Sequence, residues 1–143
     1  MLEYDVFLYE KKGGVAVEFK EKKAIYLQIA DHMCDQILTG KWPSGEKIIS
    51  IRDLAVSLQV NPNTAMRTYE YLQREGIIVN KRGIGYFVDE TAQDKIREIR
   101  RQRFFAHDLP ELIKTACMLE IDFETITKEF LFSEEKEKNN RFS

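Results

Sequence analysis

Apolar residues recur every four positions between residues 24 and 39: Ile25, Ile29, Met33 and Ile37. This recurrence predicts an amphipathic helix with one buried stripe. Gly40 and Pro43 follow, and both are typical of a helix end, because glycine adopts the left-handed conformation and proline cannot continue the hydrogen-bond ladder. A connection over residues 41–49 ends in a short predicted strand at 48–49.

A second, short helix is predicted from Ser50 to about Gln59, followed by a turn at Val60. The Ser50 hydroxyl can accept the backbone N–H of Asp53, and Asp53 can reach back, which is a variant of the capping box. The apolar face of this helix comprises Leu54, Ala55 and Leu58.

A third helix is predicted to begin at Asn61 and Pro62, because asparagine is a favoured cap and proline a favoured first helical residue. Its apolar face comprises Ala65, Tyr69 and Leu72, and its polar face comprises Asn63, Arg67, Glu70 and Arg74. Gly76 ends the helix. Two strands at 77–79 and 86–88 then form a predicted hairpin with a basic, glycine-containing tip at 80–85.

The ends of the chain are read from weaker patterns. Alternating apolar residues on both sides of Gly13 and Gly14 suggest a hairpin in an N-terminal extension over 1–23. A helical segment is predicted over 91–133, with one helix over 91–106, a second capped at Asp108 and a third beginning at Asp122. Residues 134–143 are predicted to be a frayed, charged tail.

Composition limits the classes of function. The 143 residues carry a net charge of −2, but residues 41–103 carry +4 between acidic flanks, so a local basic face is available. The sequence contains no phosphate-binding or nucleotide-binding glycine motif and no nucleophile elbow, and His32 and His107 lack neighbours at metal-ligand spacing. We therefore expect no enzyme, no cofactor and no metal. Without a secretory signal or a long apolar run, we expect a cytoplasmic protein with no membrane partner.

The order of elements over 24–90 is typical of a winged helix-turn-helix, and the predicted fold is mainly α with a small β-wing. The third helix offers small polar and basic side chains to a DNA major groove, and glycines allow the wing backbone to approach DNA closely. The predicted DNA-binding residues are Ser50, Asn61, Asn63, Thr64, Arg67, Lys81, Arg82, Gly83 and Gly85.

The same stretch resembles the GntR family of bacterial transcription regulators. Matching landmarks lie, in order, at 25–30, 38–40, 43–46, 50–55, 60–64, Tyr69, Leu72, 75–77 and 82–88. The resemblance covers about 65 of the 143 residues and implies a homodimer that binds inverted-repeat operators in double-stranded DNA. The short C-terminal part resembles the YtrA-like subfamily, whose members are often encoded beside transporter genes and dimerise through C-terminal helices.

The resemblance assigns DNA contacts to Arg52, to Asn63 and Thr64 of the recognition helix, and to Gly83 of the wing. One position departs from the family. Many members carry an arginine where this chain has Met66, and Arg67 follows it, about 100° further around the helix. The base contact of that arginine is therefore either absent or made by Arg67.

Three alternatives stay open at this level. Ser50 can serve as a cap alone, Arg52 can pair with Asp53 or Glu75, and the basic residues at 97–103 fit a solvated helix face. In this interpretation the chain is expected to be a repressor, whereas a protein-interaction module without specific DNA binding is the competing hypothesis. A small-molecule effector is neither indicated nor excluded.

A dimer needs an apolar surface that the winged helix does not use. The candidate dimerisation residues lie at helical spacing in the C-terminal segment: Ile96, Ile99, Leu112, Ile113, Ala116, Leu119, Phe123, Ile126 and Phe130. Because a ligand pocket generally needs several hundred Å³, we expect these short helices to form an interface rather than an effector domain.

Overall fold

The computed structural model describes residues 23–142, so the hairpin predicted over 1–23 lies outside the described residues. The chain divides into two compact units, one ending at Glu98 and the other beginning at Ile99. We call the described parts the winged-helix unit (23–98) and the C-terminal unit (99–142). The division falls inside a helix, beyond the boundary near residue 90 that the sequence suggested.

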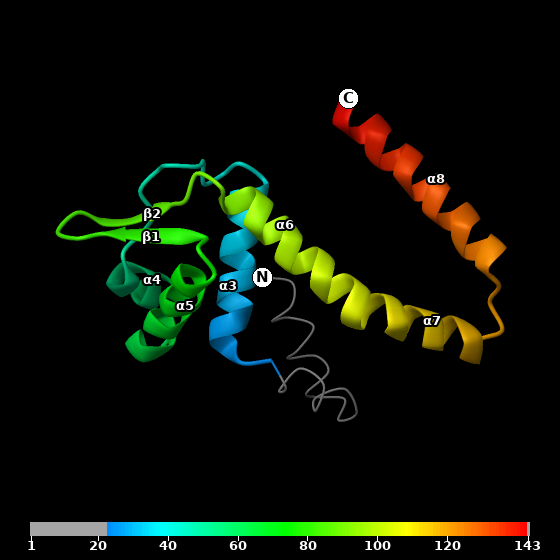
Figure 1. Ribbon diagram of the computed structural model, residues 1–143, viewed down its shortest axis with the longest axis horizontal. Coiled ribbons are helices and arrows are strands. Elements are labelled where there is room, and N and C mark those ends of the chain that lie inside the picture. The colour runs from blue at the N-terminus through cyan, green and yellow to red at the C-terminus, as the bar shows by residue number, and fades with distance from the viewer. Residues whose placement is uncertain (1–22, 143) are drawn as a thin grey trace. The chain divides into compact units, whose positions relative to one another are not determined.

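Three helices form most of the winged-helix unit: α3 (Ile25–Leu38), α4 (Ile51–Leu58) and α5 (Pro62–Arg74). Helix α5 packs against both α3 and α4 (Figure 1). All three predicted helices are confirmed to within about a residue at each end. Gln59, with φ of 53°, ends α4 in the left-handed region, and Gly76, with φ of 73°, follows α5.

The wing is a two-stranded antiparallel sheet of β1 (Ile78–Lys81) and β2 (Gly85–Val88), in which Ile78 lies opposite Val88 and Lys81 opposite Gly85. The predicted strand at 48–49 is wrong as a strand. Lys47 instead forms a single antiparallel bridge with Phe87, and the Ile48 N–H donates to the Tyr86 carbonyl at 2.9 Å. This third segment fixes β2 from its other edge.

The core of the winged-helix unit is drawn from all of its elements. Its most deeply buried large side chains are Met33, Ile37, Tyr69, Leu72, Ile77, Ile78, Val88 and Ile96. Helix α6 (Ala92–Arg103) takes part through its first turns, where Ala92 and Ile96 are at most 1% exposed. Ile96 is therefore not available for the dimer surface to which the sequence assigned it, and that assignment is corrected.

The start of α6 is also hydrogen-bonded to the rest of the winged-helix unit. The Gln93 side chain donates to the Ile37 carbonyl at 3.1 Å, and Lys95 Nζ donates to the Gly76 carbonyl at 3.0 Å. Removing everything after Glu90 would strip these contacts and part of the core. The first turns of α6 therefore belong to the DNA-binding fold.

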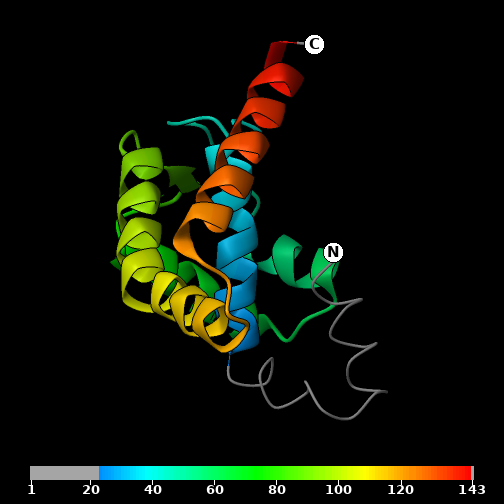
Figure 2. The ribbon, with the colours of Figure 1, turned by 90° about the vertical axis from the view of Figure 1, so that its right-hand side faces the viewer.

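The C-terminal unit contains the end of α6, a π-helical turn η1 (Phe104–Asp108), α7 (Leu109–Met118) and α8 (Phe123–Phe142). Asp108 has helical φ and ψ and makes no side-chain cap, so the break predicted there is wrong and the backbone stays helical from α6 into α7 (Figure 2). Asp122 does cap α8, because its carboxylate accepts the Thr125 N–H at 2.8 Å. The charged tail is helical to Phe142 rather than frayed.

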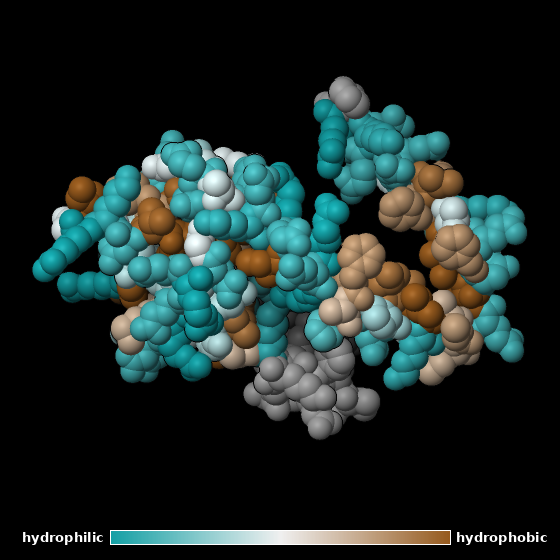
Figure 3. All heavy atoms as spheres, in the orientation of Figure 1, coloured by the Kyte–Doolittle hydropathy of each residue, from teal (hydrophilic) through white to brown (hydrophobic). Residues whose placement is uncertain are grey.

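Apolar side chains of the C-terminal unit remain open to solvent. Among its described residues only Ala116 is buried, whereas Phe123 is 83%, Phe130 66% and Ile113 52% exposed. Figure 3 shows these apolar residues gathered along α7 and the first turns of α8. Within residues 23–142, no helix is long and apolar enough to cross a membrane.

Candidate nucleic-acid interface

The start of α4 carries an exposed arginine on a capped helix. Ser50 Oγ accepts the Asp53 N–H at 3.1 Å and donates to Asp53 Oδ2 at 2.8 Å. The cap is thus confirmed, although Asp53 accepts the Ser50 hydroxyl rather than reaching back to the backbone. Because the hydroxyl is used in both directions, Ser50 acts in this structure as a cap.

Arg52 lies one residue further into α4 and is exposed. The alternative that it pairs with Asp53 or Glu75 is not seen: it makes no ion pair within the part of the chain that the structure describes. A guanidinium has five N–H donors and no acceptor. Arg52 therefore presents uncommitted donors at the helix start.

The start of α5 is held by its own cap. Asn61 Oδ1 accepts the Asn63 N–H at 2.8 Å, and Pro62 is the first helical residue, as predicted. Asn61 is thereby occupied, while the Asn63 side chain is exposed and Thr64 is half-buried. The two residues at the second and third helical positions are the ones that a recognition helix presents to base edges.

Between the starts of α4 and α5 lies a shallow hollow of about 520 Å³. Its lining is Ile51, Arg52, Ala55, Val56, Val60 and Pro62. Arg52 is the charged residue of this lining, and Val56 on α4 is 72% exposed. The hollow gives the two helices a concave, mainly apolar surface between their polar ends.

Arg67 has a more defined environment than the sequence suggested. Its guanidinium carbon lies 4.3 Å from the centroid of the Tyr26 ring, which belongs to α3. Met66, the neighbour that replaces the family arginine, is 42% exposed and makes no such contact. The arginine at position 67 therefore lies on the side of α5 that faces α3.

The wing tip is a turn of Lys81, Arg82, Gly83 and Ile84, in which the Ile84 N–H donates to the Lys81 carbonyl at 2.9 Å. Gly83, with φ of 79°, is required there because side chains disfavour a positive φ. Arg82 is exposed and has no partner among the described residues, whereas Lys81 Nζ lies 4.2 Å from the Phe87 ring centroid. In Figure 1 this tip and α4 lie on the same side of the winged helix.

Two residues of this surface were missed by sequence reasoning. The Lys47 side chain lies against Gly85, because a β-carbon added at Gly85 would be only 2.9 Å from Lys47 Cε. The glycine therefore leaves room for a third cation at the wing, beside Lys81 and Arg82. Lys47 could have been found from the sequence, because it is a basic residue directly before the strand predicted at 48–49. Tyr26, the ring under Arg67, gave no such signal.

A buried tyrosine links α5 to the start of α4. Tyr69 of α5 is fully buried, and its hydroxyl donates to the carbonyl of Ile49, just before α4. Burial, with smaller contributions from Tyr86 and Asp53, raises the pKa of the Tyr69 phenol well above its usual value. The phenol therefore remains a neutral donor at any physiological pH.

Other kinds of site find no support in the described residues. Within residues 23–142, no group of three or more His, Cys, Asp or Glu side chains could hold a metal ion. Two arginines, Arg52 at the start of α4 and Arg82 at the wing tip, are exposed and have no ion-pair partner among the described residues. This arrangement suits a polyanion with a groove, which is double-stranded DNA.

Comparison with known proteins agrees with this geometry. Residues 25–88 match the family model described as bacterial regulatory proteins, gntR family. The chain is 41% identical to an uncharacterised HTH-type transcriptional regulator, YhcF of Bacillus subtilis, over a stretch covering 53% of this chain and 63% of that protein. It is 31% identical to the HTH-type transcriptional repressor YtrA of the same organism, over 78% of this chain and 85% of that protein.

A solved structure shares the fold. A transcriptional regulator of the GntR family from Bacteroides thetaiotaomicron, 39% identical, aligns with a TM-score of 0.68 over 80% of this chain and 99% of that chain. Proteins of this kind act by binding DNA and not by catalysis. The chain belongs to the GntR family of bacterial regulatory proteins, in its short YtrA-like branch, and is a DNA-binding transcription regulator.

Proposed function

We propose that this regulator is a repressor that binds an inverted-repeat operator as a homodimer and blocks a promoter. The proposal rests on one observation: the winged-helix unit has exposed cations without partners among the described residues, and the C-terminal unit has an exposed apolar surface. The first surface fits DNA, and the second fits a further copy of the same chain.

The DNA-binding side of the proposal uses ten predicted residues in different ways. In the proposal, the side chains of Arg52, Asn63, Thr64 and Arg82 contact DNA directly. Ser50 and Asn61 cap the two helices, and Gly83 and Gly85 shape the wing. Lys81 and Arg67 lie over aromatic rings, with their charges still at the surface.

The dimer side of the proposal rests on exposed apolar area. A monomeric protein rarely leaves large aliphatic and aromatic side chains clustered in water. The exposed members of the proposed interface are Leu112, Ile113, Leu119, Phe123 and Phe130, with Ile99 and Ile126 half-buried and Ala116 buried beside them. One winged helix reads too few base pairs to find one site in a genome, and two copies on an inverted repeat double the sequence that is read.

Repression is supported by the relative YtrA, which is described as a transcriptional repressor. The family resemblance adds a proposal about the target, namely genes for a transporter. A protein bound over a promoter excludes the polymerase without further chemistry, so no cofactor is needed.

Selection of bound sites from random-sequence duplexes tests the proposal. We expect enrichment of an inverted repeat whose half-sites lie about one helical turn apart or a multiple of it. Recovery of a single half-site would contradict the dimer, and recovery of no motif would favour the protein-interaction hypothesis. Transcription in vitro from a promoter carrying the selected site then distinguishes repression from activation.

A further inference from the structure

The contact between Arg67 and Tyr26 links the recognition helix to α3. The Arg67 guanidinium carbon lies 4.3 Å from the Tyr26 ring centroid, within the range of a cation–π interaction. Arg67 is exposed, and within residues 23–142 it makes no ion pair or hydrogen bond. The ring therefore constrains the guanidinium while its N–H donors stay uncommitted.

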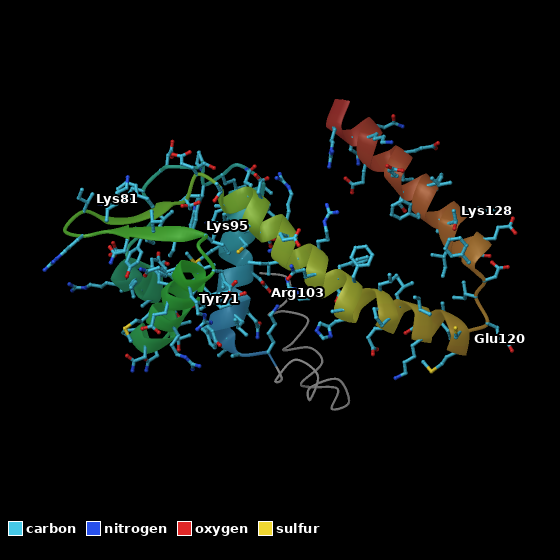
Figure 4. All side chains as sticks on the ribbon, in the orientation of Figure 1. Tyr71, Lys81, Lys95, Arg103, Glu120 and Lys128 are labelled. Atoms are coloured by element: carbon cyan, nitrogen blue, oxygen red, sulfur yellow. The ribbon has the colours of Figure 1, made fainter. Side chains whose placement is uncertain are left out.

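The Tyr26 ring is itself held in place. It meets the Tyr71 ring edge-on, with centroids 6.5 Å apart and an interplanar angle of 70°. Tyr71 lies where α5 approaches α3 (Figure 4), and the Tyr26 carbonyl accepts the hydroxyl of buried Thr68 at 3.1 Å. Contacts with two α5 residues thus fix the platform on which the arginine rests.

The direction of Arg67 follows from helix geometry. Asn63, Met66 and Glu70 are spaced three and four residues apart, so they share one exposed stripe of α5. Arg67 comes four residues after Asn63 and four before Tyr71, so it lies about 40° from each around the helix, at the border of this stripe on the side that faces α3. An arginine held there lies at the edge of a helix inserted in a groove, where the DNA backbone runs, rather than over the bases.

We propose that Tyr26 is a positioning residue that holds Arg67 for a contact with a DNA phosphate, independent of base sequence. This inference rests on the proposed DNA-binding function and specifies one of its parts. Base reading then falls to Asn63 and Thr64, and Met66 leaves the family's usual arginine contact unmade. Stacked guanidinium groups suit this role, because they keep their donors at the edge of the plane for phosphate oxygens.

The test measures binding of the full chain to the selected operator and to a shuffled duplex between about 50 and 200 mM salt. Arg67→Gln should weaken binding to both duplexes by the same factor and reduce the salt slope by about one per protomer. Tyr26→Leu should cost about two- to fivefold in binding to both, which is the effect of an exposed cation–π contact. Tyr26→Phe, which keeps the ring, should bind like the wild type.

Combining Tyr26→Leu with Arg67→Gln should weaken binding no further than Arg67→Gln alone. A wild-type affinity and salt slope for Tyr26→Leu would overturn the proposal, and so would two losses that add in full. A change in preference at one base pair in Arg67→Gln would show that Arg67 reads a base. If thermal unfolding shows that Tyr26→Leu lowers stability, Tyr26→Met replaces it.

These outcomes can be separated from failure of the proposed function itself. If the wild type does not prefer the operator to the shuffled duplex, specific recognition is wrong. The salt slopes on the shuffled duplex would still report whether Tyr26 positions Arg67 toward phosphate.

Discussion

In the winged-helix unit, α3, α5 and α6 each bury large apolar side chains, whereas in the C-terminal unit most of the large apolar side chains of η1, α7 and α8 are exposed. Both units are built from short helices, so secondary structure does not explain the difference. The first unit closes its own core with a wing and a helix start. The second unit does not bury its own apolar side chains: among its described residues, Ala116 alone is buried.

The few exposed apolar residues of the winged-helix unit sharpen the contrast. Val56, Ile84, Ile25 and Met66 are 72%, 60%, 51% and 42% exposed, and they lie on α4, the wing tip, α3 and α5. The start of α4 and the wing tip also carry the exposed arginines Arg52 and Arg82. In our proposal, the exposed surface of the first unit binds DNA, and the broad apolar surface of the second binds a further copy of the chain.

The largest expected effect comes from charging the apolar surface of the C-terminal unit. Ile113→Glu should dissociate the dimer and lower operator affinity by about 10²–10⁴-fold, because the second half-site then binds independently. Sedimentation velocity and an operator titration measure the two effects. The matched control is Lys114→Glu at the neighbouring exposed position, which should leave both unchanged. An Ile113→Glu protein that stays dimeric would place the interface elsewhere.

A smaller effect is expected from the DNA surface. Arg52→Ala should weaken operator binding by about 1–3 kcal/mol, because an uncommitted donor at the start of α4 is lost. The unfolding midpoint should not change, since Arg52 makes no ion pair in the described structure. Arg101→Ala, at an exposed arginine of α6 outside the proposed DNA surface, serves as the comparison and should bind the operator like the wild type. Unchanged operator binding by the Arg52 variant would remove this residue from the interface.

The core of the winged-helix unit predicts an effect on stability. Tyr69→Phe should lower the free energy of unfolding by about 1–2 kcal/mol, because the Ile49 carbonyl loses its buried donor. Tyr86→Phe is the control, since Tyr86 is half-buried and its hydroxyl makes no hydrogen bond to another described residue. Chemical denaturation measures both. Equal stability of Tyr69→Phe and the wild type would show that the phenol does not join the two helices.

The smallest effect is expected at the start of α6. The Asp89 carboxylate accepts the Thr91 hydroxyl and, at 2.9 Å, the Thr91 N–H, and these bonds, with a smaller contribution from Lys95, lower the pKa of the carboxyl. Its stabilising contribution is therefore present above the unfolded pKa of about 3.9 and is lost as the pH falls through the lower folded value. Asp89→Asn should cost less than about 1 kcal/mol at pH 7, and the difference from the wild type should vanish in acid. A difference that persists at low pH would assign the effect to something other than the charge.

Much of the fold follows from local patterns in the sequence. The caps at Ser50, Asn61 and Asp122 and the stop at Gly76 are local signals, and each is present in the structure. The cap at Asp108 was wrong because the π-helical turn lets the backbone continue from α6 into α7, which no side-chain pattern announces. The strand predicted at 48–49 is replaced by a single bridge between Lys47 and Phe87, with backbone hydrogen bonds between residues 45, 46 and 48 and β2 on either side of it.

The site was predictable where it depends on exposed residues at helix starts, as for Arg52 and Asn63. It was not predictable where tertiary contacts decide, because Tyr26 and Arg67 are brought together by packing of α3 on α5. Ile96 is a second residue whose role depends on tertiary contacts. Its helical spacing fits either a core or an interface, and only the fold of the winged-helix unit assigns it to the core.

The stoichiometry of the complex with the selected operator tests the central claim most directly. Sedimentation equilibrium of the full chain with a duplex that carries one inverted repeat gives the mass of the complex. We expect two chains for each duplex and a free protein that is already dimeric at micromolar concentration. One chain bound to each duplex, with a monomeric free protein, would contradict the division of labour between a DNA-reading unit and a pairing unit.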